Sequence, residues 1–139
     1  MKPMYLLFFS VFLLMYSSCH KNTNEPTGSN WLGLYQYTGY DSTSSIVVTG
    51  TMLFTRLDSV IAGEKDLTGN GPEVGTGTFI GSVDNSGIMT IEFPGNTIMT
   101  TYLVGRRANS SIAGDRYFDY GARTRGIKVG TFRLTLANH

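Results

Sequence analysis

From residue 31 onward, apolar and polar residues alternate in short segments that are separated by turn-forming residues. Successive side chains of a β-strand point to opposite faces, so a period of two indicates strands that bury one face. Threonine, glycine and aromatic residues are frequent here and alanine is scarce, which favours strands over helices. The segments expected to form strands are eight in number: 31–40, 45–55, 59–64, 75–83, 87–93, 98–106, 110–117 and 128–136.

The connections between these segments contain residues that favour turns. Residues 84–87 have the composition of a hairpin connection, and residues 65–74 indicate a longer exposed loop. The apolar residues of the fifth segment share one face: Met89, Ile91 and Phe93. In the last segment the apolar positions change phase, which predicts a β-bulge near Gly130.

Eight short strands predict an all-β protein, and a small antiparallel up-and-down barrel would remove the unpaired edges of an open sheet. A two-sheet β-sandwich is the alternative. The motifs Trp31-Leu-Gly-Leu-Tyr35 and Gly130-Thr-Phe-Arg-Leu-Thr135 resemble those of small lipocalin-like and avidin-like barrels. If the barrel is open inside, Trp31, Tyr35 and Tyr37 share one face of the first strand and are candidate ligand-binding residues. In the other interpretation these aromatic side chains fill the core.

The first 18 residues have the composition of a secretory signal peptide: a positive charge at Lys2, an apolar stretch, and small residues at its end. Ser17-Ser18-Cys19 resembles the bacterial lipoprotein signal, although Tyr16 stands where that family usually has an aliphatic residue. The resemblance implies that Cys19 is acylated, becomes the mature N-terminus and anchors the protein to a membrane of the bacterial cell envelope. Residues 19–30 then form a flexible linker, and residues 31–139 form the barrel domain.

The sequence argues against catalysis. The two histidines, His20 and His139, lie in the linker and at the C-terminus, so a Ser-His-Asp site is not expected. The single cysteine is assigned to lipidation, so a zinc site, or any metal or cofactor, is not expected either. The acidic residues around the 65–74 loop are interpreted as solvated charge: Glu64, Asp66 and Glu73. The protein is therefore expected to be a non-enzymatic binding protein.

Charge is segregated along the chain, with a net charge of −5 over residues 19–104 and +5 over residues 105–139. One interpretation is that oppositely charged strands pair. The other is a basic aromatic surface over residues 116–125 that binds an acidic protein, an anionic glycan or lipid headgroups. Nucleic acid is not expected as a partner of an exported, anchored protein. The candidate partner-binding residues are Arg116, Tyr117, Arg123 and Arg125.

The same region carries a second resemblance. Ala113-Gly-Asp-Arg-Tyr117 and Thr124-Arg-Gly126 are similar to elements of the membrane-bound lysozyme inhibitors, which are small lipid-anchored barrels. This resemblance implies an inhibitor whose Arg125 enters an acidic cleft. Two hypotheses thus remain: a barrel that binds an unknown small ligand or partner, and an inhibitor or adhesion module that acts through residues 116–125.

Overall fold

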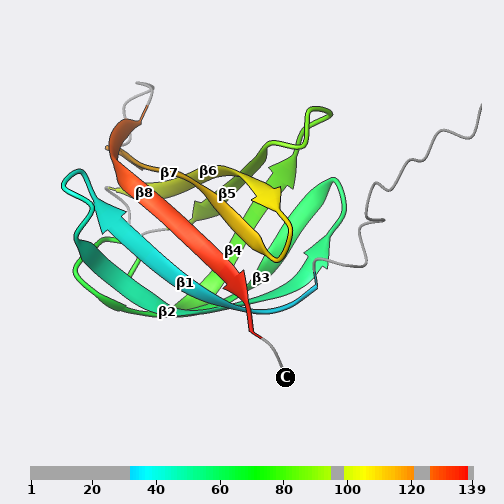
Figure 1. The fold of residues 1–139 in the computed structure, drawn as a ribbon, viewed down its shortest axis with the longest axis horizontal. Coiled ribbons are helices and arrows are strands. Elements are labelled where there is room, and N and C mark those ends of the chain that lie inside the picture. Colours follow the sequence, from blue (N-terminus) through cyan, green and yellow to red (C-terminus); the bar gives the residue numbers. More distant parts are fainter. Residues whose placement is uncertain (1–31, 95–98, 121–125, 138–139) are drawn as a thin grey trace, which may run out of the picture.

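The computed structural model describes residues 32–94, 99–120 and 126–137, and these form one closed antiparallel β-barrel (Figure 1). No helix in these three ranges is long and apolar enough to cross a membrane. The strands are β1 (Gly33–Asp41), β2 (Ile46–Leu57), β3 (Val60–Gly69), β4 (Gly75–Val83), β5 (Met89–Phe93), β6 (Thr100–Ala108), β7 (Ser111–Asp119) and β8 (Ile127–Leu136).

Each strand pairs with the next one in the sequence, and β8 returns to pair with β1. Tyr37 of β1, for example, lies opposite Leu134 of β8. This closure confirms the predicted eight-stranded up-and-down barrel and excludes the two-sheet sandwich. It also gives the first and last strands a partner on both edges, which an open sheet would leave exposed.

The strand β3 extends beyond its predicted end, and the expected loop over 65–74 is correspondingly shorter. Leu67 is buried and pairs with Gly50 of β2, so the inward face of β3 continues past Lys65. The charged run Glu64-Lys65-Asp66 obscured this alternation in the sequence. The prediction of a loop over the first half of this segment was therefore wrong.

The predicted bulge near Gly130 is confirmed. Arg116 of β7 lies opposite Gly130, but Tyr117 lies opposite Lys128, so Val129 has no partner in this pairing. The extra residue shifts the phase of β8, and the residues that follow turn their apolar side chains inward.

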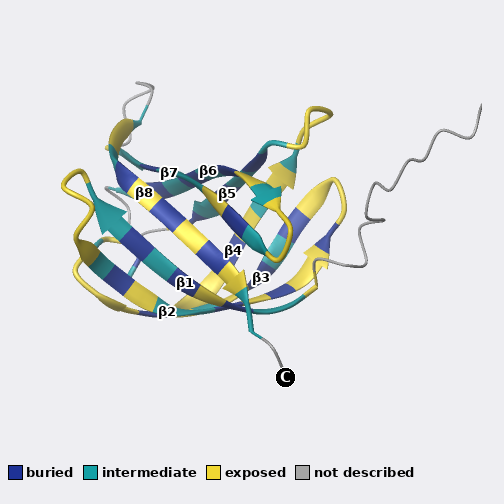
Figure 2. Cartoon of the chain, in the orientation of Figure 1, coloured by how far each residue is buried: buried dark blue, intermediate teal, exposed yellow. Residues whose placement is uncertain are grey.

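The barrel interior is filled by apolar side chains, and buried positions alternate with exposed ones along the strands (Figure 2). The predicted buried face of β5 is confirmed, since its three apolar residues are at most 2% exposed. Aromatic rings form a connected series through the core. Successive centroid distances are 5.0 Å for Tyr35–Phe54, 4.9 Å for Phe54–Phe79, 6.2 Å for Phe79–Phe93, 6.4 Å for Phe93–Tyr37 and 6.4 Å for Tyr37–Phe132.

A glycine makes room for the last ring of this series. Gly105 of β6 faces inward, and a Cβ atom there would lie 2.8 Å from Cζ of Phe132. Any side chain at residue 105 would displace the ring, so the glycine lets β6 approach the core closely.

Candidate functional site

One end of the barrel collects four connections, because alternate connections of an up-and-down barrel share an end. These are the connections β1–β2, β3–β4, β5–β6 and β7–β8, and the first two of them lie toward the left in Figure 1. A depression of about 420 Å³ opens at this end. We call it the loop-end depression, and the residues that line it are Asp41, Val47, Asn70, Gly71, Pro72, Met99, Arg116, Phe118 and Val129.

The β3–β4 connection, residues 70–74, forms one side of this depression. Asn70 N donates to Val47 O at 2.7 Å, and Val74 N donates to Gly71 O at 3.3 Å. From β3, Lys65 Nζ donates to Glu73 O at 2.6 Å and to the carbonyl oxygen of Gly75 at 3.0 Å. These contacts fold the connection toward the barrel and turn the Glu73 side chain into it.

Glu73 and Arg116 form a buried ion pair beneath the depression. Both side chains are at most 2% exposed, and Arg116 Nη2 donates to Glu73 Oε1. Arg116 Nη1 also donates to the carbonyl oxygen of Tyr40 at 2.9 Å, and Thr101 Oγ1 donates to Glu73 Oε2 at 3.4 Å. The sequence context suggested that Glu73 is a solvated loop charge, and this interpretation was wrong. An arginine from a distant strand neutralises Glu73 inside the barrel.

Tyr37 lies next to this pair. Its hydroxyl and Arg116 Nε are both buried, and Arg116 Nε has no hydrogen-bond partner among the described residues. Burial raises the pKa of Tyr37 above its ordinary value; the negative charge of Glu73 raises it further, while Arg116 opposes the shift. A Cβ atom at Gly39 would lie 3.0 Å from the Tyr37 hydroxyl oxygen and 3.2 Å from Arg116 Nε. The glycine therefore leaves the space that these two donors border.

The structure places two of the three residues of the first hypothesis inside the barrel. Tyr35 and Tyr37 share the inward face of β1, as their spacing predicted, and each is 1% exposed within the packed core. This arrangement agrees with the interpretation that they fill the core. Trp31, the third residue of that set, lies outside the described residues, as does the predicted lipidation site Cys19.

The residues of the second hypothesis are not brought together on one described surface. Arg116 points into the barrel and is buried. Tyr117, the next residue of β7, is partly exposed, and its hydroxyl donates to Asp115 Oδ2 at 3.3 Å. Arg123 and Arg125 lie outside the described residues.

Among the described residues, only one ion pair joins the acidic segment of the chain to the basic segment. The Glu73–Arg116 pair joins the acidic segment to the basic one. Asp115 pairs with Lys128 on β8 at 2.8 Å, and both of these residues belong to the basic segment. Residues adjacent on a strand point to opposite faces, so Arg116 lies inside the barrel and Asp115 does not.

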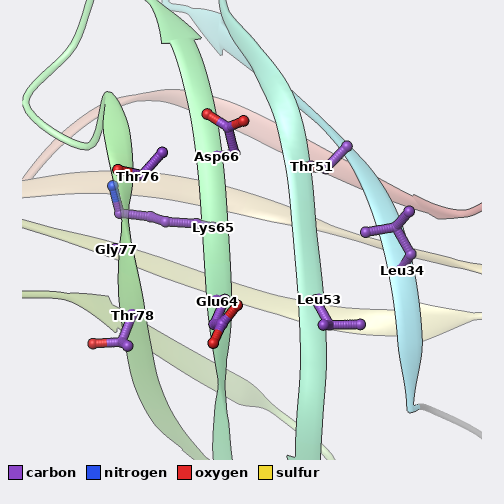
Figure 3. A pocket seen from close by; sticks show the side chains of 9 residues that line it. All are labelled: Leu34, Thr51, Leu53, Glu64, Lys65, Asp66, Thr76, Gly77 and Thr78. Carbon is purple, nitrogen blue, oxygen red and sulfur yellow. The ribbon is translucent and has the colours of Figure 1, made fainter.

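A second depression, of about 380 Å³, lies on the outer side of strands β1 to β4 (Figure 3). The carboxylates of Glu64 and Asp66 are exposed there, whereas the amine of Lys65, the residue between them, donates to the carbonyl oxygens of Glu73 and Gly75. No group of three metal-ligating side chains lies together among the residues that the structure describes. Solvated acids and threonines line this surface, and it holds no buried polar group comparable with the Glu73–Arg116 pair.

The loop-end depression therefore has the features of a binding site. Five of its lining residues are apolar, and beneath them lies one buried cation. Ligand sites of small molecules usually combine an apolar lining with a few placed polar groups, in volumes of roughly 300–1,000 Å³. Comparisons of this chain with protein-family models, curated proteins and solved structures find no match.

Proposed function

We propose that this protein is a lipid-anchored, non-enzymatic binding protein of the bacterial cell envelope, whose barrel takes a small ligand at the loop-end depression. The observation that carries the proposal is the position of the Arg116 cation, buried beneath an apolar-lined depression of about 420 Å³. A buried arginine is costly to desolvate and is retained where it is paired. Here it lies where it can orient a ligand.

The packing of the core supports a site at the end of the barrel rather than along its axis. Aromatic rings in contact occupy the interior from Tyr35 to Phe132. A ligand in that space would have to displace several buried side chains, each of which stabilises the fold. The loop-end depression needs no such displacement for an apolar group to enter.

Binding without catalysis is supported by the residues available. The chain has histidines only at positions 20 and 139, and neither belongs to one of the eight strands described. The buried carboxylate of Glu73 is bonded to Arg116 and Thr101. General acid–base chemistry needs a group within reach of the substrate proton, and this carboxylate already has other partners.

A partner protein bound through the β7–β8 connection is the second candidate function. Tyr120, at the start of that connection, is 55% exposed, and tyrosine is a frequent contact residue in interfaces. The connection begins and ends at the barrel end that carries the loop-end depression. Arg123 and Arg125 belong to the same connection and would provide its positive charge.

If Cys19 carries a lipid anchor, the protein should be found in the membrane fraction of the cell. Replacing Cys19 with alanine removes the acylated sulfur, so the variant should move from the membrane fraction to the soluble fraction. Each buried methylene of an acyl chain contributes about 0.8 kcal/mol, and losing two or more chains leaves no comparable attachment. Fractionation followed by immunoblotting measures the distribution. A variant that partitions with membranes as the native protein does would contradict the lipoprotein assignment.

If the loop-end depression is the binding site, an uncharged apolar probe should bind there. We expect N-phenyl-1-naphthylamine to gain fluorescence on binding the full chain, and the Phe118→Ala variant to bind it about 10- to 100-fold more weakly, because a contact aromatic contributes about 1.5–3 kcal/mol. The matched control is Val60→Ala, which truncates an exposed side chain at the other end of the barrel. Equal loss of affinity in both variants, or no binding to the native chain, would argue against the loop-end site.

A further inference from the structure

We propose that the Glu73 carboxylate is a built-in substitute for the carboxylate of a ligand, and that a monocarboxylate with an apolar tail displaces it from Arg116. This inference rests on the proposed function, because it assigns a ligand class to the loop-end depression. In the exchange the ligand carboxylate pairs with Arg116, while Glu73 leaves with the β3–β4 connection and reaches solvent.

Arg116 provides the first part of the argument. It is held by β7, lines the depression and is nevertheless only 2% exposed, and its guanidinium is paired with Glu73. Its Nε donor is buried without a partner among the described residues. Glu73 thus leaves one donor of the guanidinium unused. An incoming carboxylate has two oxygens and about four acceptor positions with which to engage such a donor.

The location of Glu73 provides the second part. It does not belong to a strand, but to a connection of five residues, 70–74, that carries Gly71 and the exposed Pro72. Moving this connection breaks a small number of hydrogen bonds and none of the strand pairing that closes the barrel. The connection is therefore the part of the site that can move while Arg116 stays in place.

The balance of charge provides the third part. One carboxylate replaces another, so the buried guanidinium keeps a negative partner before and after the exchange. Glu73 regains its hydration when it reaches water, which offsets much of the ion pair that it gives up. The exchange leaves the net charge around Arg116 unchanged, and it therefore selects ligands that carry a negative charge.

The walls of the depression define the rest of the ligand. Val47, Met99, Phe118 and Val129 offer an apolar surface to a hydrocarbon tail. Asp41 lies at the same site, and its carboxylate disfavours a ligand with several negative charges. The combination of one cation, apolar walls and an acidic residue fits a monocarboxylate better than a phosphate or a dicarboxylate.

The exchange is tested on the native full chain with octanoate and with 1-octanol, which has the same number of carbon atoms and no charge. Octanoate should bind about tenfold more tightly, as expected for a charge-assisted contact. It should also increase hydrogen exchange of the backbone amides in residues 70–75, whereas 1-octanol should not. Equal binding of the two probes, or binding of octanoate that leaves exchange in this segment unchanged, would overturn the inference.

Two variants separate this inference from the proposed function, and thermal melting shows whether each is folded. Glu73→Gln removes the competing carboxylate, so octanoate should bind about tenfold more tightly than it binds the native chain. The double variant Glu73→Gln/Arg116→Gln should bind octanoate and 1-octanol alike. If N-phenyl-1-naphthylamine binds but neither variant changes the preference for octanoate, the exchange is wrong and the loop-end site remains. If no probe binds the native chain, the proposed function is wrong.

Discussion

Replacing Phe79 with alanine is expected to destabilise the barrel by about 3–5 kcal/mol, which is the usual cost of truncating a fully buried phenylalanine. Phe79 is 0% exposed and lies between the rings of Phe54 and Phe93, so its loss interrupts the aromatic series at its middle. The inward-facing Gly63 lies directly opposite Phe79 on β3, and it has no side chain that could fill the space. The cavity would therefore persist.

The neighbouring residue provides a matched control for this prediction. Ile80 follows Phe79 on β4, points outward and is 52% exposed. Ile80→Ala should change the free energy of unfolding by less than about 1 kcal/mol, since exposed side chains contribute little to the core. Urea unfolding of the two variants measures both values. A similar loss of stability in both would mean that the inward and outward faces of β4 are wrongly assigned.

Replacing Glu73 with glutamine is expected to cost about 3–5 kcal/mol, because it leaves the Arg116 cation buried without a negative partner. Arg116 cannot readily move out to solvent, since β7 is paired with strands on both edges. The reverse change, Arg116→Met, should cost less. Glu73 belongs to a connection and can turn toward water once its partner is gone.

A double-mutant cycle measures the coupling between the two charges. The variant Glu73→Gln/Arg116→Met should recover much of the stability that Glu73→Gln loses, because the uncompensated cation is no longer present. Guanidinium unfolding of the two single variants and the double variant supplies the cycle. Additive losses would show that the two residues do not interact, and a greater cost for Arg116→Met would contradict the mobility assigned to Glu73.

The alternation of the sequence was sufficient to predict the eight strands and the buried face of β5. Met89, Ile91 and Phe93 are buried as their spacing indicated, and the change of phase near Gly130 marked a real bulge. These features depend on residues two positions apart on one strand, and so they are visible in a short stretch of sequence. The alternation failed on β3, where Lys65 faces inward between residues that pack in the core.

The site was predicted less well than the fold. The first strand indicated an aromatic inward face, but whether Tyr35 and Tyr37 line a cavity or fill a core depends on what the other strands contribute. Arg116 was selected as a surface contact because it lies in a basic, aromatic segment. Its position on β7 places it inside instead. A polar residue at an inward position of a strand was the one signal that could have indicated a buried role.

The amino-acid sequence by itself determined an all-β chain of eight strands, the buried face of the fifth strand, and a leader that resembles a lipoprotein signal. Only the tertiary structure decided that Glu73 and Arg116, which are 43 positions apart, meet inside the barrel. The reason is physical: strand alternation is a local property, whereas the burial of a charge depends on a partner. Closure of β8 onto β1 folds the β3–β4 connection over β7, and a carboxylate with the sequence context of a solvated loop residue becomes the counterion of a buried arginine.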